Sequence, residues 1–158
     1  MRKSPKSLVI IDMQPEFEAS KNKDVIKTVC REVRKAVRFG WHCFLVEYDC
    51  AGDTHKPIRD ALKGYKNVYK VIKYDDDGSR DIMIEAARNH ISLKNMRFCG
   101  VNSEACVFAT IDNLLHEMRN NIYVEIVSDG CNSEENNKKW VMKDLKAIKG
   151  RRRNVKIL

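Results

Sequence analysis

A repeated alternation of short apolar runs and longer amphipathic stretches is the feature that most constrains the fold of this sequence. Short apolar runs bounded by turn residues are typical of strands, whereas apolar residues recurring every three or four positions are typical of helices. From Val25 to Val37, for example, a valine stands at every fourth position, and Gly40 then ends the stripe. Strands that alternate with helices in this way predict a parallel sheet, because parallel strands need long crossover connections.

The alternation runs through the whole chain without a linker or repeat, so residues 1–158 are interpreted as a single domain. Strands are predicted at 8–11, 43–48, 68–72, 97–101, 123–127 and 155–158. Helices are predicted at 24–39, 57–62, 80–90, 104–119 and 134–149, with Ser103 and Ser133 as the N-caps of the last two. The predicted architecture is an α/β three-layer Rossmann-like sandwich, in which helices cover both faces of a mostly parallel six-stranded sheet.

Polar residues follow several of these predicted strands. In open sheets of this kind, ligands bind beyond the carboxyl ends of the strands. Asp12 follows the first strand, Lys73 follows the third, and Cys106 lies just after the fourth, in the first turn of a helix. A helix N-terminus and a nearby lysine both favour a thiolate, so we expect the pKa of Cys106 to be lowered. Asp12 would take the thiol proton and later return it to a leaving amine.

Each of these residues also has a simpler structural interpretation. A cysteine in a helix is usually a small core residue, an aspartate after a strand is often a turn residue, and a lysine there is usually a solvated charge. The three aspartates from Asp75 to Asp77 are interpreted as a solvated loop, of which one residue could contact the site. Spacing alone therefore supports a hydrolase only weakly.

Three segments of the chain resemble the isochorismatase-like superfamily of cysteine hydrolases, which includes nicotinamidases and N-carbamoylsarcosine amidases. Residues 8–17 (LVIIDMQPEF) are similar to the opening strand of that family, an apolar run followed by Asp-x-Gln and a nearby Phe. Residues 99–110 (CGVNSEACVFAT) are similar to its nucleophile segment, and residues 126–129 (IVSD) to the end of its fifth strand. The resemblance covers nearly the whole chain in the same order.

The resemblance implies a catalytic triad of Asp12, Lys73 and Cys106. The segment around Lys73 lacks the phenylalanine that follows the family's lysine, so Lys70 remains an alternative, although in a strand it would point to the opposite face.

The resemblance also implies a cis peptide bond between Val101 and Asn102. This bond would aim the Asn102 amide at the substrate oxygen, where it would form an oxyanion hole with the backbone amide of Cys106. The substrate pocket is expected to be lined by Gln14, Phe17, Glu47, Val101 and Ser103.

A cysteine nucleophile in this family favours cleavage of a C–N bond. The implied activity is hydrolysis of an amide or ureido bond of a small molecule through a thioester, without a metal or another cofactor. Metal-dependent nicotinamidases bind their metal through Asp-x-His, but here Ala51 stands two positions after Asp49, and only Cys50 and His55 remain as further candidate ligands. The alternatives are hydrolysis of nicotinamide or isochorismate, and a catalytically silent binding or regulatory protein on the same fold.

Charge and cysteine content bear on partners and location. The formal net charge is +8, and much of the excess lies in residues 143–156, but no aromatic residues interleave with this run to stack on bases, so a nucleic-acid partner is not expected. The resemblance implies a homo-oligomer, either a dimer or a tetramer. The apolar run 8–11 is too short for a signal peptide or membrane helix, so we expect a cytoplasmic protein whose six cysteines stay reduced.

Overall fold

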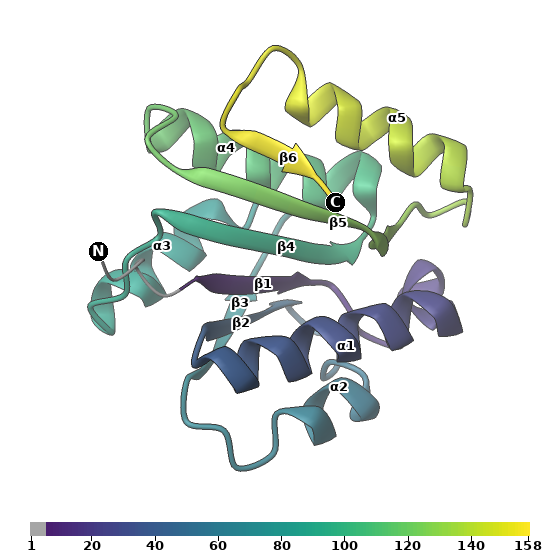
Figure 1. The fold of residues 1–158 in the computed structure, drawn as a ribbon. Helices are drawn as coiled ribbons and strands as arrows, with labels where there is room; N and C mark the ends of the chain where they lie inside the picture. The colour runs from purple at the N-terminus through teal and green to yellow at the C-terminus, as the bar shows by residue number, and fades with distance from the viewer. Residues whose placement is uncertain (1–5) are drawn as a thin grey trace.

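The computed structural model describes residues 6–158 as alternating strands and helices (Figure 1). The strands are β1 (Ser7–Ile11), β2 (His42–Tyr48), β3 (Val68–Lys73), β4 (Asn95–Val101), β5 (Tyr123–Asn132) and β6 (Val155–Ile157). The α-helices are α1 (Lys23–Phe39), α2 (Lys56–Ala61), α3 (Ser79–Arg88), α4 (Phe108–Glu117) and α5 (Lys138–Lys149). Two short helices precede α1 and α4, the 3₁₀-helix η1 (Glu18–Lys21) and the π-helix η2 (Ser103–Val107).

The six strands form one sheet in the order β3-β2-β1-β4-β5-β6, and every neighbouring pair is parallel. Apolar residues of α1 and α2 pack on one face, and those of α3, α4 and α5 pack on the other. Figure 1 shows the resulting layers, with α1 and α2 lying across the sheet from α4 and α5. The predicted α/β three-layer sandwich is therefore confirmed, and the sheet is fully parallel.

Local sequence signals explain where α1 begins and ends. The side chain of Asn22 accepts hydrogen bonds from the backbone N–H groups of Asp24 and Val25, which caps the helix N-terminus. Gly40 adopts the left-handed conformation at the other end, with φ 69°. The helix was predicted to within one residue from its valine stripe and from Gly40 at its end.

The N-caps predicted for the last two helices were wrong. Ser103 is the buried first residue of η2, and its hydroxyl donates to the carboxylates of Asp144 and Glu104 instead of capping the helix. The final helix begins at Lys138 and is capped by Asn137, whose side chain accepts from two backbone N–H groups, while Ser133 accepts from the Asn137 N–H. The intervening residues extend β5 to Asn132.

Strand β4 comes unusually close to β1 at Gly100. This glycine has φ 146°, and a Cβ atom built on it would collide with the backbone carbonyl oxygen of Ile11. The pairing of β4 with β5 also shifts register between Phe98 and Gly100. From β1, the chain adds strands β2 and β3 on one side of the sheet and then β4, β5 and β6 on the other, so the order of strand addition reverses between β1 and β4. Open α/β sheets bind ligands at this point.

A buried ionic network lies toward the start of the same strands. Arg97 in β4 contacts Glu32 of α1 at 2.7 Å and Glu125 of β5 at 2.6 Å, and Lys6 reaches Glu125 at 2.7 Å. Each buried charge therefore has a partner of opposite sign, which a buried ion requires to be tolerated. The network links α1 to β4, β5 and the residue before β1.

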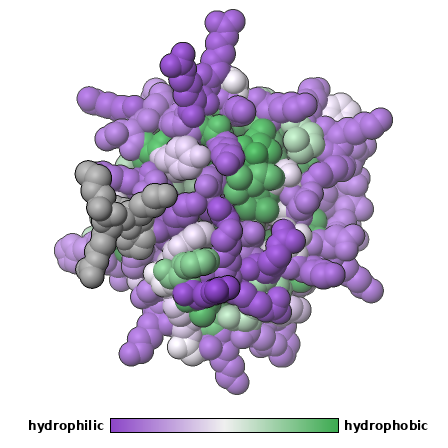
Figure 2. All heavy atoms as spheres, in the orientation of Figure 1, coloured by the Kyte–Doolittle hydropathy of each residue, from purple (hydrophilic) through white to green (hydrophobic). Residues whose placement is uncertain are grey.

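The surface charge is distributed unevenly. Nine of the 30 basic residues but only one of the 22 acidic residues lie in residues 138–158, so 21 basic and 21 acidic residues balance elsewhere. The whole excess of +8 therefore belongs to α5 and the chain end that follows it. Hydrophilic side chains cover most of the face shown in Figure 2. Among residues 6–158, no helix is long and apolar enough to cross a membrane.

Candidate active site

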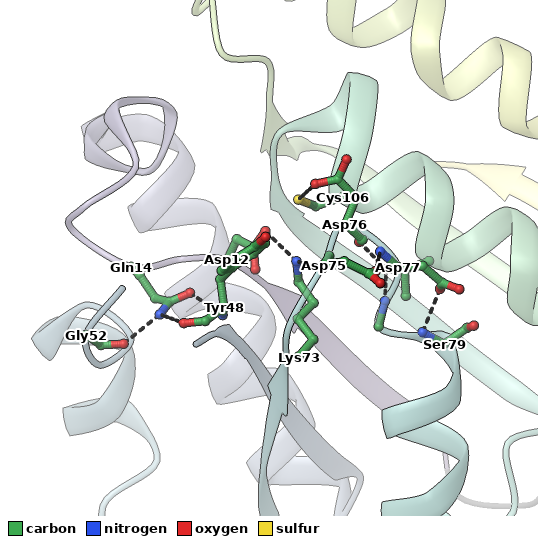
Figure 3. A network of polar contacts seen from close by, with 12 residues as sticks. Asp12, Gln14, Tyr48, Gly52, Lys73, Asp75, Asp76, Asp77, Ser79 and Cys106 are labelled. Carbon is green, nitrogen blue, oxygen red and sulfur yellow. Dashed lines mark hydrogen bonds and ion pairs between the residues drawn. The ribbon is translucent and has the colours of Figure 1, made fainter. Parts of the chain in front are cut away.

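Asp12 is the first residue after β1, and the fold forces it out of the extended conformation. Its φ is 53°, in the left-handed region that residues with a side chain rarely adopt. Its backbone N–H still donates to the carbonyl oxygen of Val46 in β2, at 2.9 Å, so the turn is anchored. The side chain is fully buried, and its Oδ2 atom lies 3.2 Å from Nζ of Lys73 (Figure 3). Strained backbone of this kind is often found at functional sites.

Lys73 is the last residue of β3 and is fully buried as well. Its ammonium group donates to the backbone oxygen of Asp75 at 2.9 Å and lies 4.4 Å from the centre of the Tyr48 ring. Gly78 lets the chain pass close to the lysine stem, because a Cβ atom there would lie 3.1 Å from Cδ of Lys73. The lysine is therefore held by a carboxylate, a carbonyl group and an aromatic face.

The alternative lysine, Lys70, lies on the other side of β3. Its ammonium group pairs with Glu47 at 2.9 Å and with Asp53 at 2.8 Å, and its side chain is half-exposed. The structure therefore brings Lys73, and not Lys70, to Asp12.

Cys106 lies in η2, the π-helical turn between β4 and α4. Only 4% of it is exposed, and its thiol donates a long hydrogen bond, 3.5 Å, to Oδ1 of Asp76 (Figure 3). The thiol also lies near the Asp12 carboxylate, which affects the pKa values of both groups. Single π-helical turns within α-helices are frequent at functional sites. Two carboxylates and one ammonium group thus surround the sulfur.

Burial dominates the protonation of these groups. It raises the pKa of Asp12 above its ordinary value, and the opposing attraction of Lys73 only partly offsets this. The pKa of the Cys106 thiol is also raised, first by burial and then by the negative charge of Asp12, against a smaller lowering by Lys73. The expectation of a lowered thiol pKa was therefore wrong, because the sequence did not show how deeply the sulfur would be buried.

A cavity of about 530 Å³ opens at the sulfur. Its wall includes Cys106, Asn102 and two aromatic residues, Phe17 and Tyr48, whose rings meet edge to face at 6.1 Å between centroids. Most of the remaining wall consists of carboxylate side chains. Of the residues expected to form the site, Cys106, Asn102 and Phe17 line this cavity.

Four residues expected in the pocket lie elsewhere. Gln14 is buried and clamps the loop after β2, donating to the backbone oxygens of Tyr48 and Gly52. Glu47 accepts two hydrogen bonds from Thr54 and pairs with Lys70 on the opposite face of the sheet.

The other two residues, Val101 and Ser103, point away from the cavity into the apolar layer and toward α5. Val101 is fully buried in the apolar layer beneath α1. The hydroxyl of Ser103 points to Asp144 in α5, at 2.8 Å. All four were placed in the pocket by their nearness in sequence to the motifs, which does not determine the direction of a side chain.

The expected cis peptide between Val101 and Asn102 is not present, because every peptide bond in residues 6–158 is trans. Asn102 instead adopts the left-handed conformation, with φ 60° and ψ 58°. Its carbonyl oxygen accepts from the N–H groups of Ala105 and Val107, so the turn into η2 closes without an unusual peptide.

The possible metal ligands after β2 do not fit a metal site. The Nε2 atom of His55 lies 2.8 Å from the hydroxyl of Ser20, and the thiol of Cys50 donates to Asp49. Within residues 6–158, no group of three or more His, Cys, Asp or Glu side chains is arranged to hold a metal ion. All six cysteines are unpaired, and Cys50 alone is exposed.

The sequence did not single out Tyr48, and it left open which residue of the aspartate tract contacts the site. Tyr48, the last residue of β2, lies against Lys73 and lines the cavity, and its position at a strand end was the available signal. Asp76 contacts the sulfur, and only its membership in the aspartate tract pointed toward this role.

Comparison with known proteins gives structural relatives only. No family model and no curated protein matches the sequence. A Staphylococcus aureus nicotinamidase superposes with a TM-score of 0.79 at 15% identity, covering 99% of this chain and 100% of that one. A structure titled MAR1 ribonuclease from Caenorhabditis elegans gives 0.74 at 19% identity, covering 100% and 79%. An N-carbamoylsarcosine amidase from Thermoplasma acidophilum gives 0.70 at 16% identity, covering 97% and 95%. The chain thus has the isochorismatase-like fold, in agreement with the resemblance in sequence.

Proposed function

We propose that this chain, which has the isochorismatase-like fold, is a cysteine hydrolase that cleaves an amide or ureido C–N bond of a small molecule. The observation that carries the proposal is the buried Asp12–Lys73 pair beside Cys106, which lines a cavity large enough for a small ligand. Its structural neighbours include hydrolases of C–N bonds. A nucleophile, a base and a charge that orients the base form the minimal set for acyl transfer.

The first step forms a thioester. Because the thiol is protonated at rest, Asp12 takes its proton as the sulfur attacks the carbonyl carbon. The C=O π electrons move to oxygen, and the tetrahedral intermediate then collapses with cleavage of the C–N bond. Asp12 gives the proton to the departing nitrogen, so ammonia or an amine leaves and the acyl group stays on Cys106.

The second step releases the acid. Asp12, ionised again, takes a proton from water as the water oxygen attacks the thioester carbon. Collapse of this intermediate breaks the C–S bond, and the sulfur regains its proton from Asp12. The products are a carboxylic acid, or a carbamic acid from a ureido substrate, and the free thiol.

The oxyanion of each intermediate is assigned to the backbone N–H groups of Asn102 and Cys106. The left-handed Asn102 lines the cavity next to the sulfur, so its peptide group is close to where the oxygen must lie. Removal of one such donor typically lowers turnover about 10²–10³-fold.

Lys73 acts as a positioning residue. Burial raises the pKa of Asp12, and the ammonium group of Lys73 lowers it, which favours the ionised carboxylate that acts as the base. The carbonyl group of Asp75 and the Tyr48 ring hold the ammonium group in place.

Ammonia release from a panel of primary amides and ureido compounds tests the proposal. Cys106→Ala, Asp12→Asn and Lys73→Met are expected to abolish release, whereas Cys50→Ser, at the exposed cysteine, should retain it. Equal release by Cys106→Ala and the wild type would contradict a cysteine mechanism. Nicotinamide belongs in the same panel, whereas hydrolysis of isochorismate, a vinyl ether without nitrogen, would be followed by the release of pyruvate. A protein that turns over no compound but binds one would instead be a binding or regulatory protein.

Two expectations about the whole protein remain part of the proposal. The chain is expected to form a dimer or tetramer, which light scattering of the purified protein would test. Its six unpaired cysteines are compatible with the cytoplasm, where thiols stay reduced.

A further inference from the structure

The cavity at Cys106 is lined by five carboxylate side chains and, among the described residues, by no basic one. The five are Glu16, Glu18, Asp76, Glu104 and Glu134. They come from four separate segments: the loop after β1 with η1, the loop after β3, η2, and the loop after β5. Within residues 6–158, only Glu18 among them forms a salt bridge, with the exposed Lys21. Among the described residues, the other four have no lysine or arginine partner; Glu104 accepts hydrogen bonds from the Glu134 N–H and the Ser103 hydroxyl, and Asp76 accepts one from the Cys106 thiol.

The charge of the residues that line this cavity is opposite in sign to the net charge of the whole chain. The chain carries a net charge of +8, yet its basic excess lies in residues 138–158 and not around the site. Lys73, the cation near the sulfur in the part of the chain that the structure describes, is fully buried and already paired with Asp12. A negative cavity in a positive protein is therefore a property of the site and does not follow from overall composition.

The carboxylates are too dispersed to form a metal site, because no group of three or more ligating side chains converges in the described residues. The cavity that they line also contains the aromatic rings of Phe17 and Tyr48. Carboxylates spread around a partly aromatic wall suit an organic cation such as an ammonium or guanidinium group, which aromatic rings also attract.

We propose that the substrate is a cationic amide, whose positive group is held by the carboxylates at the cavity mouth while its C–N bond lies at Cys106. The proposal rests on the proposed function and names the class of its substrate. Clefts lined by one sign of charge raise association rates of the opposite charge by about 10–10³-fold, and this preference weakens in salt. The same field disfavours carboxylate substrates and the phosphates of RNA.

Charged thiol reagents test the cavity without requiring turnover. We would compare trimethylammonioethyl methanethiosulfonate, a permanent cation, with sulfonatoethyl methanethiosulfonate, an anion, and follow the labelling rate of Cys106 by peptide mass spectrometry at alkaline pH and low salt. The cation should label Cys106 roughly tenfold or more faster, relative to the same ratio measured on 2-mercaptoethanol. Sodium chloride at about 0.5 M should reduce the preference, because the Debye length falls to a few ångströms.

The double variant Glu16→Gln, Glu134→Gln should reduce the ratio of the two rates several-fold. Both side chains are exposed, so neither substitution threatens the fold. Glu117→Gln, at an exposed glutamate near the end of α4, is the matched control and should leave the ratio unchanged. Equal labelling by the two reagents, or a ratio that is the same in the double variant and the wild type, would overturn the proposal.

Three amides of equal length separate this inference from the proposed function. These are 4-ammoniobutanamide, neutral pentanamide and anionic glutaramate, and ammonia release should decrease in that order. Hydrolysis of all three at similar rates would overturn the cationic preference and leave the cysteine hydrolase standing. A preserved labelling preference with no hydrolysis of any amide would instead count against the hydrolase and leave the cation-selective cavity.

Discussion

The Nζ atom of Lys73 lies 3.2 Å from the Oδ2 atom of Asp12, and neither side chain has any exposed surface. The two residues are 61 positions apart, at the ends of β3 and β1, and the sheet order places β2 between those strands. Because the strands are parallel, Asp12 and Lys73 lie at the same edge of the sheet, beyond the carboxyl ends of the strands. Cys106, in the turn that follows β4, lies at this edge as well. Most of the behaviour expected of this protein follows from that buried pair.

Asp12→Asn should separate the reactivity of the thiol from catalysis. The charge of Asp12 is the second cause of the raised pKa of Cys106, after burial, so its removal should shift alkylation of Cys106 by iodoacetamide to lower pH. Turnover should nevertheless fall by roughly 10²–10⁴-fold, because the general base is lost. Asp129→Asn, at an exposed aspartate paired with Lys138, is the control. An unchanged alkylation profile in Asp12→Asn would show that the carboxylate does not act on the sulfur.

Lys73→Met should make stability depend on pH through Asp12. Loss of the ammonium group raises the folded-state pKa of Asp12 still further above its ordinary value of 3.8. As pH rises from about that value, the unfolded chain ionises first, so the variant loses stability progressively up to the folded-state pKa. The expected cost at neutral pH is about 3–5 kcal/mol, and it should shrink in acid.

Urea unfolding of Lys73→Met and the wild type at several pH values measures this dependence. Lys56→Met, which removes an exposed pair with Asp60, should change the free energy of unfolding little at any pH. A stability deficit in Lys73→Met that is constant with pH would contradict the linkage to Asp12.

Gly100→Ala should damage both stability and the site. A Cβ atom at this position meets the backbone of Ile11, the residue before Asp12, and the φ of 146° is strained for any residue with a side chain. Gly64→Ala provides the matched control, because Gly64 has φ 78° but nothing within 4 Å of a built Cβ atom. Both variants place a side chain at a positive φ, but only Gly100→Ala also pushes β4 away from Ile11 in β1. A larger loss of turnover in Gly100→Ala than in Gly64→Ala would therefore show that the close β1–β4 contact is needed. Equal losses would show that the contact is not needed.

Arg97→Met should lower stability without changing the chemistry. It leaves the buried carboxylates of Glu32 and Glu125 without their shared cation, at an expected cost of about 3–5 kcal/mol. Burial opposes ionisation of Glu125, but ion pairing with Lys6 and Arg97 outweighs it and lowers the pKa of Glu125, so the deficit should shrink as pH falls and Glu125 takes up a proton. Turnover per folded molecule should be unchanged, because Arg97 lies near the start of β4 and the site lies beyond its end. Reduced turnover in an Arg97→Met variant that is fully folded would contradict the expectation that Arg97 affects stability and not catalysis.

The fold could be predicted from the sequence because its signals are local. Apolar runs, the valine stripe and its stop at Gly40 each require only a few neighbouring residues to interpret. The extension of β5 to Asn132 and the π-helical turn η2 could not be predicted in this way. The extension depends on how β4 pairs with β5 around Gly100, which is a property of the assembled sheet.

The site was predicted less completely, for two physical reasons. Alternate residues of a strand face opposite layers, so Glu47 points away from the cavity although the residue after it, Tyr48, lines it. The pKa of Cys106 depends on how much protein covers the sulfur, and burial outweighs the nearby lysine. Residues at strand ends could be named from the sequence, but their directions and protonation required the structure.

Covalent trapping of the acyl group is the measurement that tests the central claim most directly. The protein would be mixed with the amide it hydrolyses best, quenched in acid within the first turnovers, and examined by intact and peptide mass spectrometry. We predict a mass increase equal to the acyl group, localised to Cys106 and absent from Cys106→Ala. Ammonia release by the wild type without a Cys106 adduct, together with undiminished release by Cys106→Ala, would contradict the thioester mechanism.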